Sequence, residues 1–192
     1  MVGGTIQIRE HGTNMGNVGT YSANSVGEVR VNHNGVVEYR VDGTSVYNST
    51  RTVTYPLNVD VSFYSPGGEF DNIRWLGEST AAPTRSPTES PSNSPTPSPS
   101  NSPTQPIGVG ETIDFGSHVG LTSSTAGQLY KSGTSSSWDA GAVSNYAFTA
   151  NDPNGIAGVS ITAKQNDKYA MLGLNSGSTS DHYNDIDFAL YQ

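Results

Sequence analysis

Short segments in which apolar and polar residues alternate run through the first part of the chain. In residues 5–10 (TIQIRE), Ile6 and Ile8 alternate with Gln7 and Arg9. Residues 57–64 (LNVDVSFY) alternate in the same way, with Leu57, Val59, Val61 and Phe63 on the inward face and Asn58, Asp60, Ser62 and Tyr64 on the outward face. Because strand side chains point alternately to two faces, both segments are predicted to be half-buried strands.

Residues 28–49 carry the strongest turn signals. Asn34-Gly35 and Asp42-Gly43 separate alternating segments. Both dipeptides favour type I′ turns, in which the two central residues need positive φ. We therefore expect a three-stranded antiparallel meander. Residues 69–76 (EFDNIRWL) are predicted to form a further strand, with Phe70, Ile73 and Trp75 in the core.

The part of the chain after residue 106 is also predicted to consist of strands, at residues 112–115, 128–131, 145–149, 156–163, 169–174 and 186–191. Turns are expected at residues 152–155 (DPNG) and 165–168 (QNDK). No window has the periodicity of an amphipathic helix. The chain is therefore predicted to be all-β, with about twelve short strands.

A segment rich in proline, serine and threonine separates the two parts. Residues 79–106 contain eight of the eleven prolines and none of Leu, Ile, Val, Phe, Tyr, Trp or Met. Proline lacks the N–H that a helix or sheet needs, and without apolar side chains the segment has no core to offset the entropy of ordering. We interpret it as an extended linker, suited to O-glycosylation or to plain spacing.

The two parts are complementary rather than repeated, because the meander has no counterpart after residue 106. The chain ends within an alternating segment (DIDFALYQ) and begins with another (TIQIRE), preceded by MVGG. Read in the order second part then first part, these segments form a hairpin. We therefore expect residues 1–78 and 107–192 to be the C-terminal and N-terminal halves of one domain, with 79–106 bridging them.

Composition narrows the classes of function. The 192 residues include no cysteine, so disulfides and Cys-metal chemistry are excluded. The net charge of −8 without any run of Lys or Arg argues against nucleic acid as a partner. No stretch approaches the ~18 apolar residues of a membrane span, and no signal peptide is expected within this chain.

In the swapped order the chain resembles the concanavalin A-like lectin/glucanase jelly roll, of the laminin-G or SPRY-like kind. The resemblance rests on YAMLGLNSG, YNDIDFALY, NHNGVVEYRVDGTSVYNS and YPLNVDVSFYSPGGEFDNIRW. It implies a two-sheet antiparallel jelly-roll sandwich, circularly permuted, with its usual ends bridged by the linker. The halves can close within one chain, which effective concentration favours, or be exchanged between molecules in a domain-swapped or tandem assembly.

Some proteins of this superfamily hydrolyse glycans with paired acidic residues on one strand. The nearest equivalent is Asp185-Ile186-Asp187, whose carboxylates would share one face of a strand. The only glutamate after residue 106 is Glu111, and a retaining glycosidase needs a carboxylate pair. We expect no catalysis, and we expect Asp185 to close a turn.

Two groups of residues are candidates for ligand binding. The polar loop 178–185 has a composition suited to sugars, with Asp181, His182, Tyr183 and Asn184. The outward row Asn58, Asp60, Ser62 and Tyr64 is the second candidate. An ordinary solvated loop and an ordinary solvated face are the alternatives. Trp138 is either a core plug or a ligand platform, and Trp75 is expected in the core.

Metal and modification sites have weaker signals. The oxygen-bearing residues that could bind calcium are Asp60, Asp71, Asn72, Asp181 and Asp185, but they lack the spacing of a known loop motif. The histidines His11, His33, His118 and His182 lack the spacing of a zinc site. Asn48-Ser49-Thr50 fits the N-glycosylation pattern. We expect no other cofactor.

Three functions remain open. The favoured hypothesis is a non-catalytic lectin-like module of an extracellular or surface adhesion protein, with a glycan or surface polymer as partner and no insertion into a membrane. The second is a structural or self-associating spacer domain of a repeat protein. The third is a glycan hydrolase.

Overall fold

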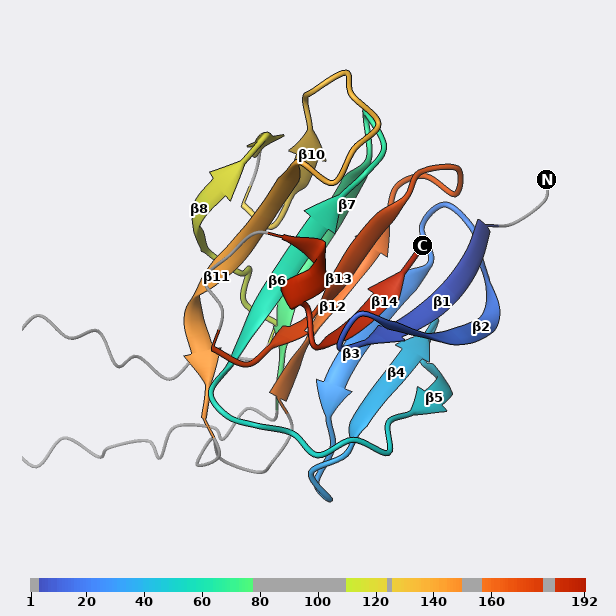
Figure 1. The fold of residues 1–192 in the computed structure, drawn as a ribbon, viewed down its shortest axis with the longest axis vertical. Helices are drawn as coiled ribbons and strands as arrows, with labels where there is room; N and C mark the ends of the chain where they lie inside the picture. Colours follow the sequence, from blue (N-terminus) through green and yellow to red (C-terminus); the bar gives the residue numbers. More distant parts are fainter. Residues whose placement is uncertain (1–3, 78–109, 124–125, 150–156, 178–181) are drawn as a thin grey trace, which may run out of the picture.

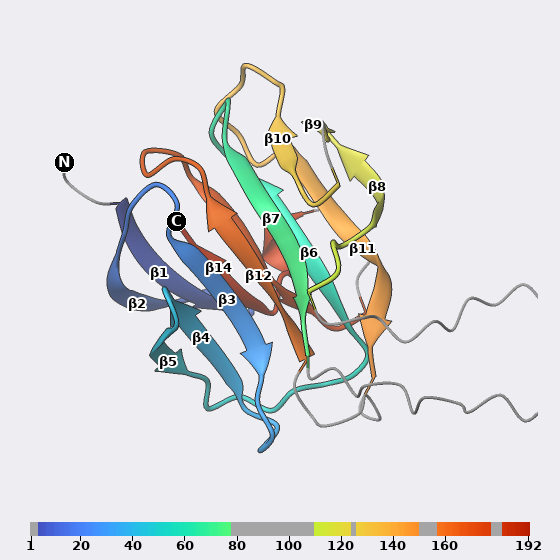
Figure 2. The ribbon, with the colours of Figure 1, turned by 180° about the vertical axis from the view of Figure 1, so that it is seen from behind.

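The computed structural model describes residues 4–77, 110–123, 126–149, 157–177 and 182–192. The linker predicted at 79–106, the turn predicted at 152–155 and the candidate residue Asp181 lie outside these ranges. Within them the chain is all-β, as predicted, and forms a sandwich of two antiparallel sheets (Figures 1 and 2).

Each sheet has seven strands in the described part of the chain. Sheet A has the order β2 (Thr13–Tyr21), β1 (Gly4–Glu10), β14 (Phe188–Tyr191), β13 (Ala170–Asn175), β6 (Leu57–Phe63), β11 (Ala140–Phe148) and β8 (Phe115–Val119). Sheet B has the order β5 (Thr44–Asn48), β4 (Val37–Val41), β3 (Val26–Val31), β12 (Ala157–Ala163), β7 (Glu69–Leu76), β10 (Leu129–Lys131) and β9 (Leu121–Thr122). Strands from both sides of residues 78–109 therefore occur in both sheets.

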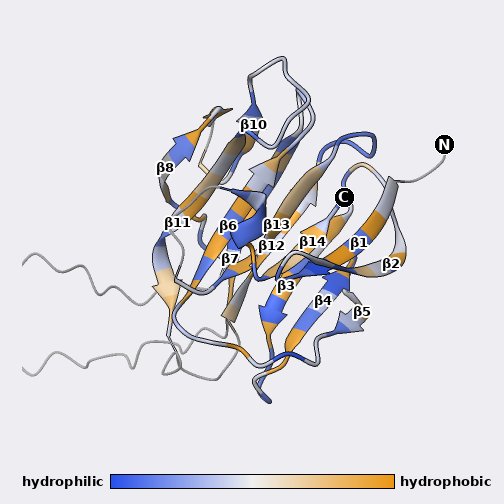
Figure 3. Ribbon diagram, in the orientation of Figure 1, coloured by the Kyte–Doolittle hydropathy of each residue, from blue (hydrophilic) through white to orange (hydrophobic). Residues whose placement is uncertain are grey.

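The apolar faces of the two sheets meet in the core. Along β3 and β4, apolar and polar bands alternate, as Figure 3 shows. Ring contacts join the sheets: Phe63 of β6 lies 4.8 Å from Phe70 of β7, and Trp75 of β7 lies 4.7 Å from Phe148 of β11. The expected core positions of Phe70, Ile73 and Trp75 are confirmed, since each is at most 3% exposed.

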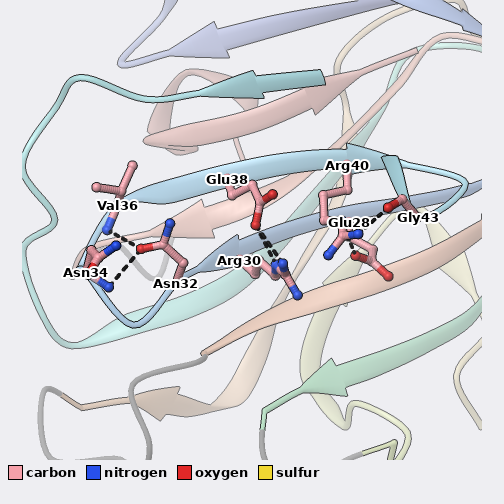
Figure 4. A network of polar contacts seen from close by, with 8 residues as sticks. All are labelled: Glu28, Arg30, Asn32, Asn34, Val36, Glu38, Arg40 and Gly43. Carbon is pink, nitrogen blue, oxygen red and sulfur yellow. Dashed lines mark hydrogen bonds and ion pairs between the residues drawn. The ribbon is translucent and has the colours of Figure 1, made fainter. Parts of the chain in front are cut away.

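The meander is confirmed as β3, β4 and β5, but only one of its turns has the predicted geometry. At Asp42-Gly43 both residues have positive φ, of 48° and 77°. At Asn34-Gly35 only Gly35 does, so a type I′ turn was the wrong prediction there. The Asn32 side chain explains this loop, because its Oδ1 accepts hydrogen bonds from the backbone N–H groups of Asn34 and Val36 (Figure 4).

The outer face of sheet B is a network of charged pairs. Arg30 of β3 donates twice to Glu38 of β4, at 2.9 and 2.6 Å, and Arg40 lies 3.7 Å from Glu28 (Figure 4). Opposite charges directly across two strands stabilise their pairing. The charged side chains of this face therefore pair with one another.

Three strands were not predicted. They are β2, β8 and β9, all at or next to sheet edges. The predicted strand at 112–115 is a single bridge between Thr112 and Arg74, and β8 starts only at Phe115. The predicted strand at 186–191 starts later, at Phe188, because residues Tyr183–Asp185 form a 3₁₀ turn, η1.

The two chain ends lie on neighbouring antiparallel strands. Gln7 of β1 is opposite Tyr191 of β14. The described residues that flank 78–109 are also neighbours: Gly110 N donates to Trp75 O, and Trp75 N donates to Glu111 O, both at 3.0 Å. The described residues on either side of the range 78–109 therefore lie side by side on the sandwich.

Candidate functional site

The outer face of sheet A carries polar and aromatic residues in rows that cross the strands. The strand register places Asn17, Gln7, Tyr191 and Met171 side by side on β2, β1, β14 and β13. The neighbouring row holds Asn14, Arg9, Ala189 and Gly173. Gln7 and Arg9 reach this face because Ile6 and Ile8 point into the core.

Residues 182–187, here called the cover, lie over the middle of this face, with η1 in front of the sheet in Figure 1. Ile186 is buried with Met171 and Ala189, and Tyr183 packs against them. A Cβ on Gly173 would lie 2.5 Å from Ile186 Cγ2 and 2.1 Å from Phe188 O. Glycine is therefore required at position 173 for this cover to close.

The cover overturns one expectation about the row Asn58, Asp60, Ser62 and Tyr64. These residues do share the face opposite the core, but Asp60 and Ser62 are fully buried. Asp60 accepts a hydrogen bond from Asn175 at 3.0 Å, and Asn58 donates to the carbonyl oxygens of Ser144 and Tyr146. Of this row, only Tyr64 belongs to the group of aromatic rings described next.

Five aromatic residues form a continuous group, here called the aromatic strip: Tyr64, Trp138, Tyr169, Tyr183 and Tyr191. Trp138 stacks on Tyr183 at 5.0 Å and lies 5.5 Å from Tyr64 and 5.9 Å from Tyr191. Tyr191 in turn stacks on Tyr169 at 5.9 Å. The structure thus brings predicted Tyr183 and Tyr64 together with Trp138, which is half-buried outside the main core.

A buried lysine positions the loop that carries Trp138. Lys131 is 1% exposed, and its Nζ donates to Tyr64 O, Ser137 O and Asp139 Oδ1 at 2.9, 2.6 and 2.6 Å. The hydrogen bond from Lys131 is the main reason that the pKa of Asp139 is lowered from its ordinary value of 3.8. Lys131 therefore ties the residues on both sides of Trp138 to the end of β6.

Beside the aromatic strip lies an open hollow of about 550 Å³, here called the trough. Amide side chains line it, from Gln7 of β1, Asn14 and Asn17 of β2, and Asn166 of the β12–β13 turn. Tyr21, Tyr169 and Tyr191 supply its rings. Tyr169 is 53% exposed, so its ring is open to a ligand.

The charged residues of the trough are Arg9, Asp167 and Lys168. Lys168 lies 3.9 Å from Asp167. The guanidinium carbon of Arg9 lies 5.1 Å from the centre of the Tyr191 ring, within the range of a cation–π contact. Among the described residues Arg9 has no carboxylate within 4 Å, and its buried Nε has no hydrogen-bond partner.

Burial affects the tyrosines of the trough. Desolvation, helped by the charge of Asp167, raises the pKa of Tyr21 to about 12. Desolvation also raises the pKa of Tyr191, against the opposing effect of Arg9. Both phenols are therefore protonated at neutral pH, and the Tyr21 hydroxyl donates to Lys168 O at 3.5 Å.

The two aspartates considered for catalysis do not share a strand face. Asp185 lies in η1, and its backbone N–H donates to His182 O at 2.9 Å. Asp187 precedes β14; it accepts a hydrogen bond from Ser176 N at 2.8 Å and lies 2.9 Å from His11 Nδ1. The expectation that Asp185 closes a turn is confirmed. Asp187 holds the β1–β2 turn against the cover.

The structure does not bring the candidate calcium ligands together. Asp60 lies under the cover on sheet A, Asp71 and Asn72 lie on β7 of sheet B, and Asp185 lies in η1. Asp71 pairs with Lys164 at 3.4 Å. In the described ranges no three His, Asp or Glu side chains form a group that could hold a metal ion. Asn48 is exposed at the end of β5.

His182 and Asn184 are exposed, and the His182 ring lies 4.7 Å from Tyr183 of the aromatic strip. The trough itself was not predicted, since its residues come from β1, β2, β14 and the β12–β13 turn. The alternation in TIQIRE already placed Gln7 and Arg9 on an outward face. No pattern in the sequence indicated that Tyr169 and Tyr191 would join them.

Within the described ranges, the chain has no helix of the length and apolarity needed to cross a lipid bilayer. No protein-family model matches the chain, and comparisons with curated proteins and with solved structures gave no match either.

Proposed function

We propose that the chain is a non-catalytic saccharide-binding module and that the trough and the aromatic strip are its binding surface. The observation that carries this proposal is the exposed ring of Tyr169 next to four amide side chains in an open hollow. The proposed surface combines His182, Tyr183 and Tyr64, which were candidates from the sequence, with residues that the sequence did not indicate.

The chemistry of the surface fits sugars. The C–H face of a pyranose ring stacks on an aromatic ring, while its hydroxyl groups both donate and accept hydrogen bonds. The amide groups of Gln7, Asn14, Asn17 and Asn166 also donate and accept. Because the trough is open, a ligand keeps part of its surface in water, and we expect weak binding of a single sugar unit.

For the fold, we propose a concanavalin A-like jelly roll in circularly permuted order. Two neighbour relations support this interpretation. The chain ends lie on the paired strands β1 and β14, where an unpermuted chain would have a hairpin. Trp75 and Gly110 are hydrogen-bonded, where an unpermuted chain would have its ends. Neighbouring termini make such permutation sterically easy.

For the setting, we propose an extracellular or surface protein in which Pro/Ser/Thr segments space such modules. The contact between Trp75 and Gly110 supports a closed monomer, because the chain completes its own sandwich. We propose no cofactor for binding. A structural calcium ion would show as a loss of binding or stability after addition of EDTA.

The test is a glycan array followed by NMR titration of the full chain with the saccharides that score highest. We expect amide shifts at residues 5–21, 166–169 and 182–192, and no turnover of the saccharide. Shifts confined to sheet B would refute the site. A flat array together with concentration-dependent assembly in light scattering would favour the structural spacer instead.

A further inference from the structure

We infer that the saccharide recognised by the trough is acidic and that Arg9 pairs with its carboxylate; this inference rests on the proposed function. The reason is that Arg9 has no anionic partner in the trough. The side chains that line the trough include two cations, Arg9 and Lys168, and one carboxylate, Asp167. Gln192, the last residue of the sequence, also lines it. Arg9 is therefore the group to which a ligand carboxylate would bind.

Arg9 is the cation whose charge is not matched. Lys168 has Asp167 at 3.9 Å, whereas Arg9 has no ion pair within the described ranges. The nearby Asp187 is already engaged by Ser176 and His11. The neighbours of Arg9 across the strands are Asn14 on β2 and Ala189 on β14, and neither is charged.

The contact with Tyr191 holds Arg9 in place for this role. The guanidinium lies over the Tyr191 ring at 5.1 Å, and Tyr191 is stacked on Tyr169 at 5.9 Å. An arginine on an aromatic face keeps its planar fork of donors free for a carboxylate. A uronic acid residue would thus find a carboxylate partner in Arg9 and a stacking ring in Tyr169 within one hollow.

The same charges set a limit on the ligand. A polyanion would meet one arginine without an ion pair on a chain that repels it, because the net charge is −8. We therefore infer a saccharide with isolated carboxylates rather than a densely sulfated polymer.

The test uses disaccharides that each carry one uronic acid, such as cellobiouronic acid, each paired with its carboxyl-reduced counterpart, such as cellobiose. Affinities of the full chain are measured by NMR titration for the unaltered protein, Arg9→Gln, Arg9→Lys and the control Lys164→Gln, whose side chain pairs with Asp71 of β7. We expect at least one acidic member to bind about tenfold more tightly than its neutral counterpart.

The variants separate the role of Arg9 from general effects. Arg9→Gln should abolish the preference for the acid over its neutral counterpart, Arg9→Lys should keep part of this preference, and Lys164→Gln should keep all of it. A second measurement needs no variant. Raising the salt concentration from roughly 0.05 to 0.5 M should weaken binding of the acidic sugar but not of the neutral one.

Equal binding of acidic and neutral members would overturn the inference and leave the proposed function standing. So would binding of neutral array saccharides alone, or a preference that survives in Arg9→Gln. If the array and both members of every pair fail to bind, the proposed function is wrong, and this inference falls with it.

Discussion

Arg9 and Tyr191 meet across the paired strands β1 and β14, with the guanidinium carbon 5.1 Å from the ring centre. One residue lies near the start of the chain and the other is the second to last. The trough is therefore built from both ends of the chain, and it exists only where these two strands are paired. Substitutions can therefore test the residues that hold this surface in place, as well as the residues that would contact the ligand.

Lys131→Met should both destabilise the fold and weaken saccharide binding. The substitution leaves the buried carbonyl oxygen of Phe63, and those of the half-buried residues Tyr64 and Ser137, without their shared donor. Each unsatisfied buried group costs about 1–3 kcal/mol, so we expect a loss of about 2–4 kcal/mol in the free energy of unfolding by urea titration. Binding should weaken because Trp138 loses its support.

Lys164→Met is the matched control, because Lys164 is 37% exposed and has a single partner at 3.4 Å. It should change the free energy of unfolding by less than about 1 kcal/mol and leave binding unchanged. Equal effects of the two substitutions would contradict the role assigned to Lys131.

The ion pair of Lys131 also predicts a dependence on pH. The folded-state pKa of Asp139 is lower than its ordinary value of 3.8, mainly through the hydrogen bond from Lys131. A lowered pKa gives a stabilising contribution that is present above the unfolded-state pKa and is lost as the pH falls through the folded-state pKa. Thermal melting between pH 7 and about pH 2 should therefore show a smaller acid-induced loss for Asp139→Asn than for the unaltered chain.

Gly173→Ala should be strongly destabilising. Its Cβ would lie 2.1 Å from the carbonyl oxygen of Phe188, so either β14 or the cover must move. Overpacking of this kind costs about 1–3 kcal/mol or more. Gly19→Ala on β2 is the control, since nothing lies within 4 Å of its added Cβ. Comparable melting temperatures for the two variants would show that the cover does not pack as described.

Arg51→Gln should lower the free energy of unfolding, because it leaves a buried carboxylate without its ion-pair partner. Glu10 is 0% exposed; it accepts a hydrogen bond from Tyr39 Oη at 3.2 Å and lies 3.2 Å from Arg51 Nε. Removing the arginine should cost about 2–4 kcal/mol in urea unfolding, because the charge stays buried without its partner. Adding Glu10→Gln should recover part of this loss. Full additivity of the two substitutions would contradict the coupling.

Patterns within a strand allowed much of the fold to be predicted from sequence. Alternation assigned the inward residues of β1, β4 and β6, and Asp42-Gly43 has the turn geometry that its residues favour. The strand β2 (TNMGNVGTY) was missed because it is a polar, glycine-containing edge strand with few apolar positions. The type I′ turn predicted at Asn34-Gly35 was wrong because a side chain outside the dipeptide, that of Asn32, determines the loop conformation.

The candidate site was harder to predict, because alternation assigns a face but not what lies over it. Asp60 and Ser62 were expected on an open face, yet residues 182–187 and Trp138 cover that side of the sheet. Gln7, Asn17 and Tyr191 lie in one row only through the register of three strands that are distant in the sequence. Such a row depends on long-range pairing, which local patterns do not encode.

The most direct test of the saccharide-binding surface compares two exposed tyrosines. Tyr169 of the trough is 53% exposed, and Tyr130 of β10 on sheet B is 40% exposed. Their alanine variants should both keep the fold. We predict that Tyr169→Ala weakens binding of the best array saccharide about tenfold in calorimetric titration, while Tyr130→Ala binds as the unaltered chain does. Unchanged affinity in Tyr169→Ala, or an equal loss in Tyr130→Ala, would contradict the account.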